Sequence, residues 1–163
     1  MKEKLPLKGM FKLEHYDKEG THLGTYDVQN GIVDVGMNYL LDAGFNGGTQ
    51  NSTWYMGLID NSGFSSLNAA DTMGSHSGWA EAEGYTEAGR PEWGAGSASS
   101  RQVTNATTTN FSINGTATMY GIFITTVNTK GGTTGTLWST AAFSSTVSTS
   151  NGDTLKVTYT VSG

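Results

Sequence analysis

The second half of this chain is rich in residues that favour β-strands and carries almost no charge. Of the 70 residues in the range 94–163, 28 are Ser or Thr. Only Arg101, Lys130, Asp153 and Lys156 are charged there. Glycine and asparagine interrupt this half at short intervals, so its strands must be short and joined by turns. Such a sequence predicts antiparallel β-structure rather than parallel strands that alternate with helices.

The strand expected at residues 154–161 shows the alternation most clearly. One of its faces is apolar and the other carries Thr and Lys, which is the period of a half-buried strand. The apolar residues are Leu155, Val157, Tyr159 and Val161. We expect this face to point into the protein core.

Further strands are expected along the whole chain. Residues 8–16 and 21–28 should form a hairpin around the turn sequence at 17–20. Other strands are expected at residues 53–59 and 135–143. The Asn114-Gly115 pair lies between an apolar segment that ends at Ile113 and a strand at 116–125, and it predicts that these two segments pair as a hairpin.

One helix is expected, near residues 33–43. Val33, Met37, Leu40 and Leu41 have the spacing of a single apolar helix face, and Asp34 lies near the N-terminal end, where negative charge is favourable. Together these patterns predict an all-β protein, an antiparallel, jelly-roll-like β-sandwich with one short helix. Its 163 residues fit a single domain, 1–163.

Composition excludes several classes of function. The net charge of −5 and the pI of about 5.0 disfavour nucleic acid or an anionic membrane as the main partner, since both attract basic surfaces. The chain contains no cysteine, which excludes disulfides, thiol nucleophiles and Cys-based zinc sites. His15, His22 and His76 lack the spacing of metal ligands, and no Gly-rich phosphate-binding motif is present. We therefore expect no cofactor and no metal.

The densest cluster of reactive side chains lies in residues 79–93. This segment contains four carboxylates and Arg90, together with aromatic residues. We expect a structural loop in which Arg90 pairs with a Glu beneath Trp rings. A glycosidase that used Glu81 and Glu83 as its acid and base is the alternative. The residues assigned to the structural cluster are Trp79, Glu81, Tyr85, Arg90 and Trp93.

Several segments together resemble a family of tailed-bacteriophage virion structural proteins. They are residues 17–20, 30–42, 54–60, 79–93, 121–124, 135–140 and 151–159, in this order. The resemblance covers nearly the whole chain and is most distinctive in the Trp79–Trp93 block and the following Leu-Trp-Ser-Thr strand. It implies a head decoration, or cement, protein with a jelly-roll-like fold and without catalytic residues.

That resemblance also implies partners and a location. The expected partners are the major capsid protein and further copies of the chain, as a dimer or trimer. The expected location is the capsid surface of the virion, after assembly in the cytoplasm of a host bacterium. A nearly uncharged Ser/Thr surface fits contact with copies or partners, because an isolated soluble domain normally carries more charge.

The first residues form a candidate capsid-contacting arm. Lys2, Lys4 and Lys8 precede or begin the first expected strand, so residues 1–7 could extend from the domain and order on an acidic shell.

Two other functions remain open. One is a receptor-binding or carbohydrate-binding tail module that uses exposed Trp and Tyr, and the other is the glycan-degrading enzyme described above.

Overall fold

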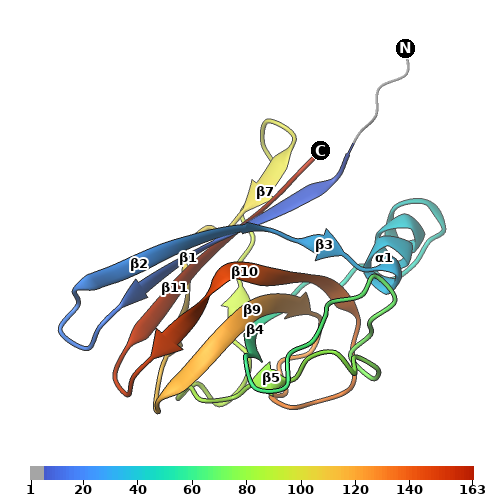
Figure 1. The fold of residues 1–163 in the computed structure, drawn as a ribbon. Coiled ribbons are helices and arrows are strands. Elements are labelled where there is room, and N and C mark those ends of the chain that lie inside the picture. The colour runs from blue at the N-terminus through green and yellow to red at the C-terminus, as the bar shows by residue number, and fades with distance from the viewer. Residues whose placement is uncertain (1–5) are drawn as a thin grey trace.

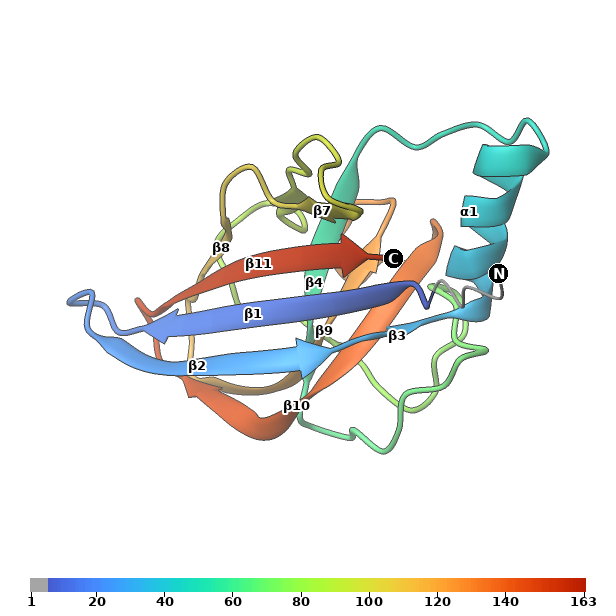
Figure 2. The same ribbon diagram turned by 90° about the horizontal axis from the view of Figure 1, so that it is seen from above.

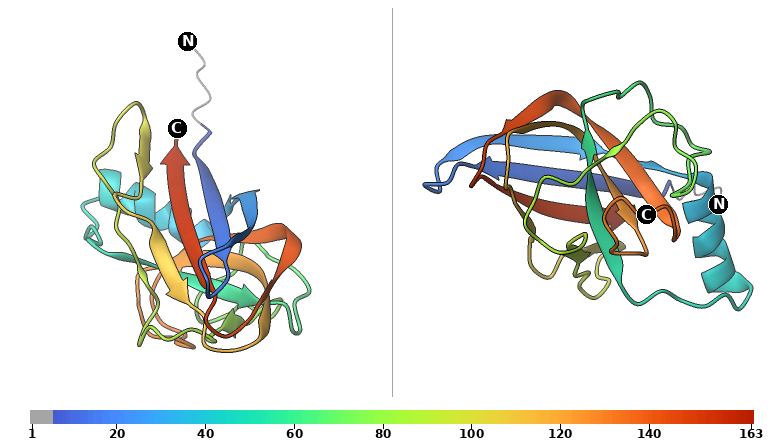
Figure 3. Two further views of the ribbon diagram at one scale, coloured as in Figure 1. Left: turned by 90° about the vertical axis from the view of Figure 1, so that its left-hand side faces the viewer. Right: turned by 90° about the horizontal axis from the view of Figure 1, so that it is seen from below.

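The computed structural model describes residues 6–163 and has two antiparallel β-sheets packed face to face, with one helix at an end of the sandwich (Figure 1). The predicted all-β sandwich with a single short helix is therefore confirmed. Figure 3 shows the two layers from two further directions, with the C-terminal end of the chain on the side where the helix lies.

The first sheet contains the hairpin that the sequence predicts for residues 8–28. β1 (Lys8–Tyr16) and β2 (His22–Gln29) form the expected hairpin, and β11 (Thr154–Ser162) pairs with the other edge of β1. Two shorter strands, β7 (Gln102–Thr104) and β8 (Thr109–Ser112), both pair with β11.

The second sheet has β9 and β10 at its centre. β10 (Leu137–Thr149) pairs with β9 (Ala117–Thr125), which pairs with β4 (Trp54–Asp60). Short strands complete the edges: β3 (Gly31–Ile32) lies on β10, while β5 (Glu81–Ala82) and β6 (Glu92–Trp93) lie on β4. β10 runs six residues beyond the expected strand, and its register with β9 shifts between Ala142 and Val147.

The core lies between the two sheets. The inward face of β11 carries Leu155, Val157 and Tyr159, all fully buried, as the alternation predicts. Phe11 of β1 stacks on Tyr159 with 4.3 Å between ring centroids. The Tyr159 hydroxyl accepts hydrogen bonds from Asn30 Nδ2 at 2.6 Å and from Trp138 Nε1 at 2.8 Å. Because Trp138 lies on β10, this buried hydroxyl joins the two sheets.

The hairpin predicted at Asn114-Gly115 is wrong. β8 pairs with β11 in the first sheet, whereas β9 pairs with β4 and β10 in the second. The segment between them therefore crosses from one layer to the other. Asn-Gly favours a tight turn locally, but the partner of each strand is chosen by long-range pairing that buries its apolar residues.

The helix α1 (Asp34–Phe45) forms close to its predicted place and lies across one end of the sandwich (Figure 2). Its apolar face is only partly covered. Val33 and Gly36 are buried, and a Cβ on Gly36 would collide with the backbone of Trp138, so a glycine permits this close approach. Leu40 and Leu41 are 41% and 49% exposed, and Phe45 is 88% exposed. The helix therefore presents apolar side chains to the outside.

Candidate functional site

The segment 79–93 runs along the outer edge of the second sheet. Its two short strands, β5 and β6, both pair with β4, and the residues between them form a loop. Because β4 fixes both ends of this loop, its side chains are held against the sheet.

Arg90 and Glu81 form a buried, two-pronged ion pair within this segment. Arg90 Nε donates to Glu81 Oε1 at 2.9 Å, and Nη2 donates to Oε2 at 2.7 Å. Arg90 also donates to the carbonyl oxygens of Val127 and Gly132. The Arg90 side chain is fully enclosed, and the second Glu81 oxygen also accepts a hydrogen bond from the backbone of Gly131. This pair ties the segment to the β9–β10 connection.

The aromatic ring beside Arg90 belongs to Phe123, not to a tryptophan. The guanidinium carbon of Arg90 lies 5.2 Å from the Phe123 ring centroid. The centroids of the Trp79 and Phe123 rings are 5.1 Å apart. Trp79 donates through Nε1 to Asp71 and stacks on His76 at 3.9 Å. Phe123 was not singled out from the sequence because its apolar neighbours, Ile122 and Ile124, make it look like any residue of a buried strand.

Tyr85 lies deeper, between the segment and β8. Its ring meets Phe111 edge-on at 5.0 Å, and Lys130 Nζ lies 3.9 Å from the ring centroid and donates to the Tyr85 carbonyl oxygen. The Tyr85 hydroxyl is buried and has no hydrogen-bond partner among residues 6–163. Burial raises the pKa of Tyr85 above its ordinary value of 10, and the negative charge of Glu81 adds to this effect.

The buried tyrosines Tyr85 and Tyr159 should make the folded protein less stable as pH rises into the alkaline range. Burial raises the pKa of Tyr159 as well as that of Tyr85. Above pH 10 the unfolded chain loses these phenolic protons while the folded protein keeps them, so the free energy of unfolding should fall as pH rises. The expected slope is about 1.4 kcal/mol per pH unit for each such tyrosine. Urea unfolding between pH 9 and 11.5 measures it, and the slope should be smaller in Tyr85→Phe. An unchanged slope in that variant would contradict the pKa shift.

Trp93 is separated from the other members of the cluster. It lies at the end of the sandwich next to α1, with its ring edge-on to Tyr159 at 5.1 Å and its Nε1 donating to Asn105 at 2.9 Å. The structure thus brings Trp79, Glu81 and Arg90 together around Phe123, keeps Tyr85 close enough to be affected by the charges of Glu81 and Arg90, and places Trp93 elsewhere.

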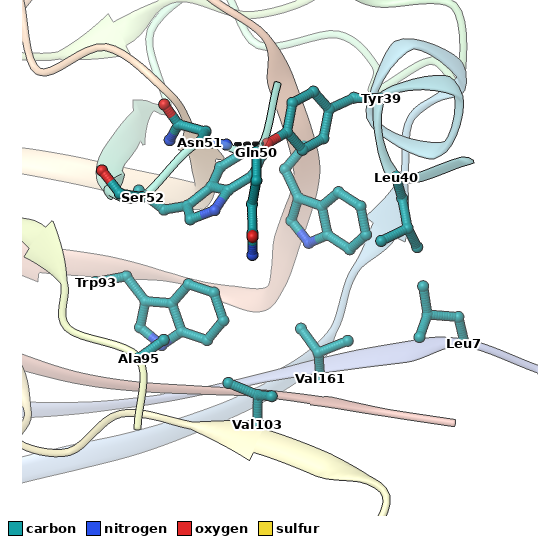
Figure 4. Close-up of a pocket in the computed structure, with 12 residues that line it drawn as sticks. Leu7, Tyr39, Leu40, Gln50, Asn51, Ser52, Trp93, Ala95, Val103 and Val161 are labelled. Carbon is teal, nitrogen blue, oxygen red and sulfur yellow. Dashed lines mark hydrogen bonds between the residues drawn. The ribbon is translucent and has the colours of Figure 1, made fainter. Parts of the chain in front are cut away.

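Trp93 instead lines a pocket of about 390 Å³ at the end of the sandwich, which we call the end pocket (Figure 4). Two other tryptophans, Trp54 and Trp138, and the aliphatic side chains of α1, β7 and β11 form most of its wall. The remaining lining residues are Leu7, Tyr39, Leu40, Gln50, Asn51, Ser52, Ala95, Val103 and Val161. The sequence gives no sign of this pocket, because its residues come from segments far apart in the chain.

The glycosidase alternative needs the carboxylates of Glu81 and Glu83 to be free to contact a substrate. Both oxygens of Glu81 are engaged by Arg90, and Glu87 accepts hydrogen bonds from the backbone of Ser112. Glu83 lies beside Gly131 at a hollow of about 260 Å³ that Glu81 also lines. Both Glu81 oxygens already accept hydrogen bonds from Arg90, and one of them also accepts from the backbone of Gly131, so this geometry favours a structural role for Glu81.

Other kinds of site are not found in the part of the chain that the structure describes. Within residues 6–163, no three His, Asp or Glu side chains gather in a way that could hold a metal ion. Within the same range, no helix has the combination of length and apolar character that crossing a membrane requires. Lys8 is exposed at the first position of β1, while Lys2 and Lys4 lie outside the described residues.

The sequence was also compared with known proteins. No protein-family model matches the chain, and no curated protein matches its sequence. Function therefore has to be inferred from the residues and the geometry described above.

Proposed function

We propose that this protein decorates the head of a tailed bacteriophage, binding as a homo-oligomer to the outside of a shell built from the major capsid protein. The observation that carries this proposal is the apolar end of the sandwich. Leu40, Leu41 and Phe45 project from α1 beside the end pocket. Exposed apolar groups concentrated at one place on a small domain usually mark a surface that binds another protein.

The nearly uncharged surface supports the same proposal. On β10, Ser144, Ser145, Thr146 and Ser148 are all exposed. A surface of hydroxyls can form hydrogen bonds to a neighbouring protein without burying charges, whose desolvation would be costly. Such strands suit repeated contact with neighbours on a lattice better than isolation in solution.

Decoration would stabilise a shell through added interface area. A shell under internal pressure fails where subunits separate, and a rigid sandwich that bridges neighbouring subunits opposes this separation. A standard protein interface buries roughly 1,600 Å² in total. Because one oligomer offers several such contacts at once, individually weak contacts can give tight overall binding.

Two structural details favour this proposal over the alternatives. Sugar rings stack on open aromatic faces, but Trp93 and Trp138 in the end pocket are only 8% and 7% exposed. These two rings offer little surface to a sugar, which counts against a carbohydrate-binding module, and of the three tryptophans that line the pocket Trp54 alone is partly exposed. The engagement of Glu81 by Arg90 counts against the glycan-degrading enzyme.

A decoration assay tests the proposal. Purified protein is mixed with undecorated capsids, and the bound fraction is measured by co-sedimentation. We expect the double variant Leu41→Asp/Phe45→Asp to bind at least tenfold more weakly, because each change places a charge on the apolar end. Leu23→Asp is the matched control, since Leu23 is similarly exposed but lies on β2 near the opposite end of the sandwich. Equal binding by both variants would contradict attachment through this end.

Two further measurements test the arm and the stabilising role. Protein lacking residues 1–7 should fold and oligomerise but fail to decorate capsids. If this shortened protein decorated capsids at full occupancy, the hypothesis of a capsid-contacting arm would be rejected.

Particles that lack the protein should lose DNA on heating or chelator treatment before complete particles do. If both kinds of particle resist equally, the receptor-binding alternative becomes the better one.

A further inference from the structure

One edge of the first sheet is a long strand with a free outer side. β2 is the outermost strand of this sheet, and no residue of the range 6–163 pairs with its outer side (Figure 2). The other strands that end the two sheets, β3, β5, β6, β7 and β8, have only two to four residues each. β10 is unpaired beyond Thr140 on its β3 side, but its ladder with β9 is irregular between Ala142 and Val147. β2 is therefore the long, regular sheet edge that the described structure leaves open.

This edge lacks the features that normally keep edge strands from pairing with other chains. Those features are lysine and other charges, proline and β-bulges. Residues 22–29 contain no Pro, Lys or Arg, and Asp27 is their single acidic residue. The register skips Leu23, because His22 and Gly24 face consecutive residues of β1. From Gly24 onward the edge is regular and can accept a further strand.

The ladder with β1 fixes which backbone groups of β2 point outward. Asn30 donates its backbone N–H to the Gly9 carbonyl oxygen at 3.0 Å, so these two residues form a hydrogen-bonded pair. Such pairs recur at every second residue of an antiparallel ladder, and the register is continuous up to Gly24. The even-numbered residues of β2 therefore bond to β1, whereas Thr25 and Asp27 direct their N–H and C=O groups away from it.

The inward side chains of this edge are incompletely buried. Tyr26 and Val28 pack against the core, yet both remain partly exposed. The Tyr26 ring contacts Phe143 of β10, with 6.0 Å between the ring centroids. A strand added beside β2 would cover Tyr26 and Val28 from the open side, and removing apolar area from water is favourable.

We propose that a second copy of the chain supplies this strand, so that two β2 strands pair antiparallel about a twofold axis. The same edge then serves both copies, as a twofold interface requires. The outward N–H and C=O groups of Thr25 bond to those of Asp27 in the other copy. This inference rests on the homo-oligomer of the proposed function and identifies its interface.

Charge selects one register of this pairing. Residues opposite each other in an antiparallel pair point to the same face, so the axis must lie at a residue rather than between two. An axis at Asp27 would place two carboxylates opposite each other, which is unfavourable. An axis at Thr25 would bring the irregular Leu23 into the pairing. An axis at Tyr26 places Asp27 opposite Thr25 of the other copy, whose hydroxyl can donate to the carboxylate.

β10 would enlarge the interface beyond the two paired strands. A strand pair alone buries less than the roughly 1,600 Å² of a standard interface. Phe143 brings β10 against β2, and the residues that follow it, Ser144, Ser145 and Thr146, are exposed. Their hydroxyls would border the second copy and add contact area without burying charge.

Single cysteines test the register, because the natural chain has no cysteine. The thiol of Tyr26→Cys would lie opposite its own copy, at the Cα separation of about 4.5 Å of a non-hydrogen-bonded pair, which a disulfide can bridge. Mild oxidation should therefore give a covalent dimer on a non-reducing gel. Val28→Cys is the matched control, since Val28 is also half-buried on β2 but would face Gly24 of the other copy, so it should stay monomeric. No dimer from Tyr26→Cys, or equal amounts from both variants, would overturn the proposal.

Sedimentation equilibrium tests the pairing without introduced cysteines. The unchanged chain should reach twice its mass of 17.2 kDa as its concentration rises. Thr25→Pro removes an N–H that points to the second copy and leaves the bonds to β1 in place, so the dissociation constant should rise about tenfold. Thr25→Val keeps this donor and should dimerise nearly as well as the unchanged chain. A monomeric unchanged chain, or equal association of the two variants, would sink the pairing. The cysteine experiment decides the matter if Thr25→Pro does not fold.

Neither experiment contains capsids, so the two proposals fail separately. A dimer of this kind that does not decorate capsids would contradict the proposed attachment alone. A monomer that decorates them would contradict the pairing of β2 alone.

Discussion

The Arg90→Ala protein is expected to lose about 3–5 kcal/mol of its free energy of unfolding, because the change leaves the Glu81 carboxylate without its cation in a buried site. The Arg90 side chain makes four hydrogen bonds, two of them to Glu81. The carbonyl oxygens of Val127 and Gly132, which accept hydrogen bonds from Arg90, would also lose this donor. The sequence predicts a smaller loss of about 1–3 kcal/mol, because it does not reveal how fully the pair is enclosed.

Urea unfolding of two conservative variants distinguishes the ion pair from simple packing. Arg90→Lys keeps the charge but not the planar, two-pronged geometry, so it should recover only part of the loss. The double variant Arg90→Met/Glu81→Gln removes both charges and should be more stable than Arg90→Ala. An unchanged melting temperature in Arg90→Ala, together with loss of a glycan-cleaving activity, would instead assign these residues to an enzyme.

The second large effect is expected at the Tyr159 hydroxyl. Tyr159→Phe removes the acceptor of two buried donors, Asn30 Nδ2 and Trp138 Nε1, while leaving the ring in place. A buried polar group left without its partner costs about 1–3 kcal/mol, so the variant should lose about 2–4 kcal/mol in total. Because the three residues come from both sheets and from the segment that links them, the loss should appear as a lower melting temperature of the whole domain.

Tyr85→Phe is the matched control for this experiment. Tyr85 is as deeply buried as Tyr159, but its hydroxyl has no partner within residues 6–163. Removing a hydroxyl that forms no hydrogen bond should leave the stability unchanged or raise it. If the two Tyr→Phe variants lost equal stability, the hydrogen bonds of Tyr159 would not be the cause.

Local sequence patterns determined the elements that depend on neighbouring residues. The strand alternation at 154–161 places Leu155, Val157 and Tyr159 in the core, where the structure has them. The β1–β2 hairpin and the helix also form near their predicted positions. These features follow from the two-residue period of a strand, from turn residues and from helical spacing, each of which is readable within a few residues.

Which strands pair was decided only by the tertiary structure. The Asn114-Gly115 turn signal predicts a hairpin, yet the segments on its two sides enter different sheets. β11 gains β8 as a neighbour although the two lie far apart in sequence. A turn signal reports a local conformational preference, whereas pairing depends on how much apolar surface the whole arrangement buries.

The same distinction applies to the candidate site. Sequence identified Arg90 as a residue that needs an acidic partner, since a charged group in an aromatic segment must be paired if it is buried. Only the fold determined that Glu81 is this partner, that Phe123 supplies the adjacent ring and that Trp93 lies at the other end of the segment in a pocket with Trp54 and Trp138. Residue type fixes which contacts a side chain requires, but the atoms that satisfy them come from distant strands that packing brings together.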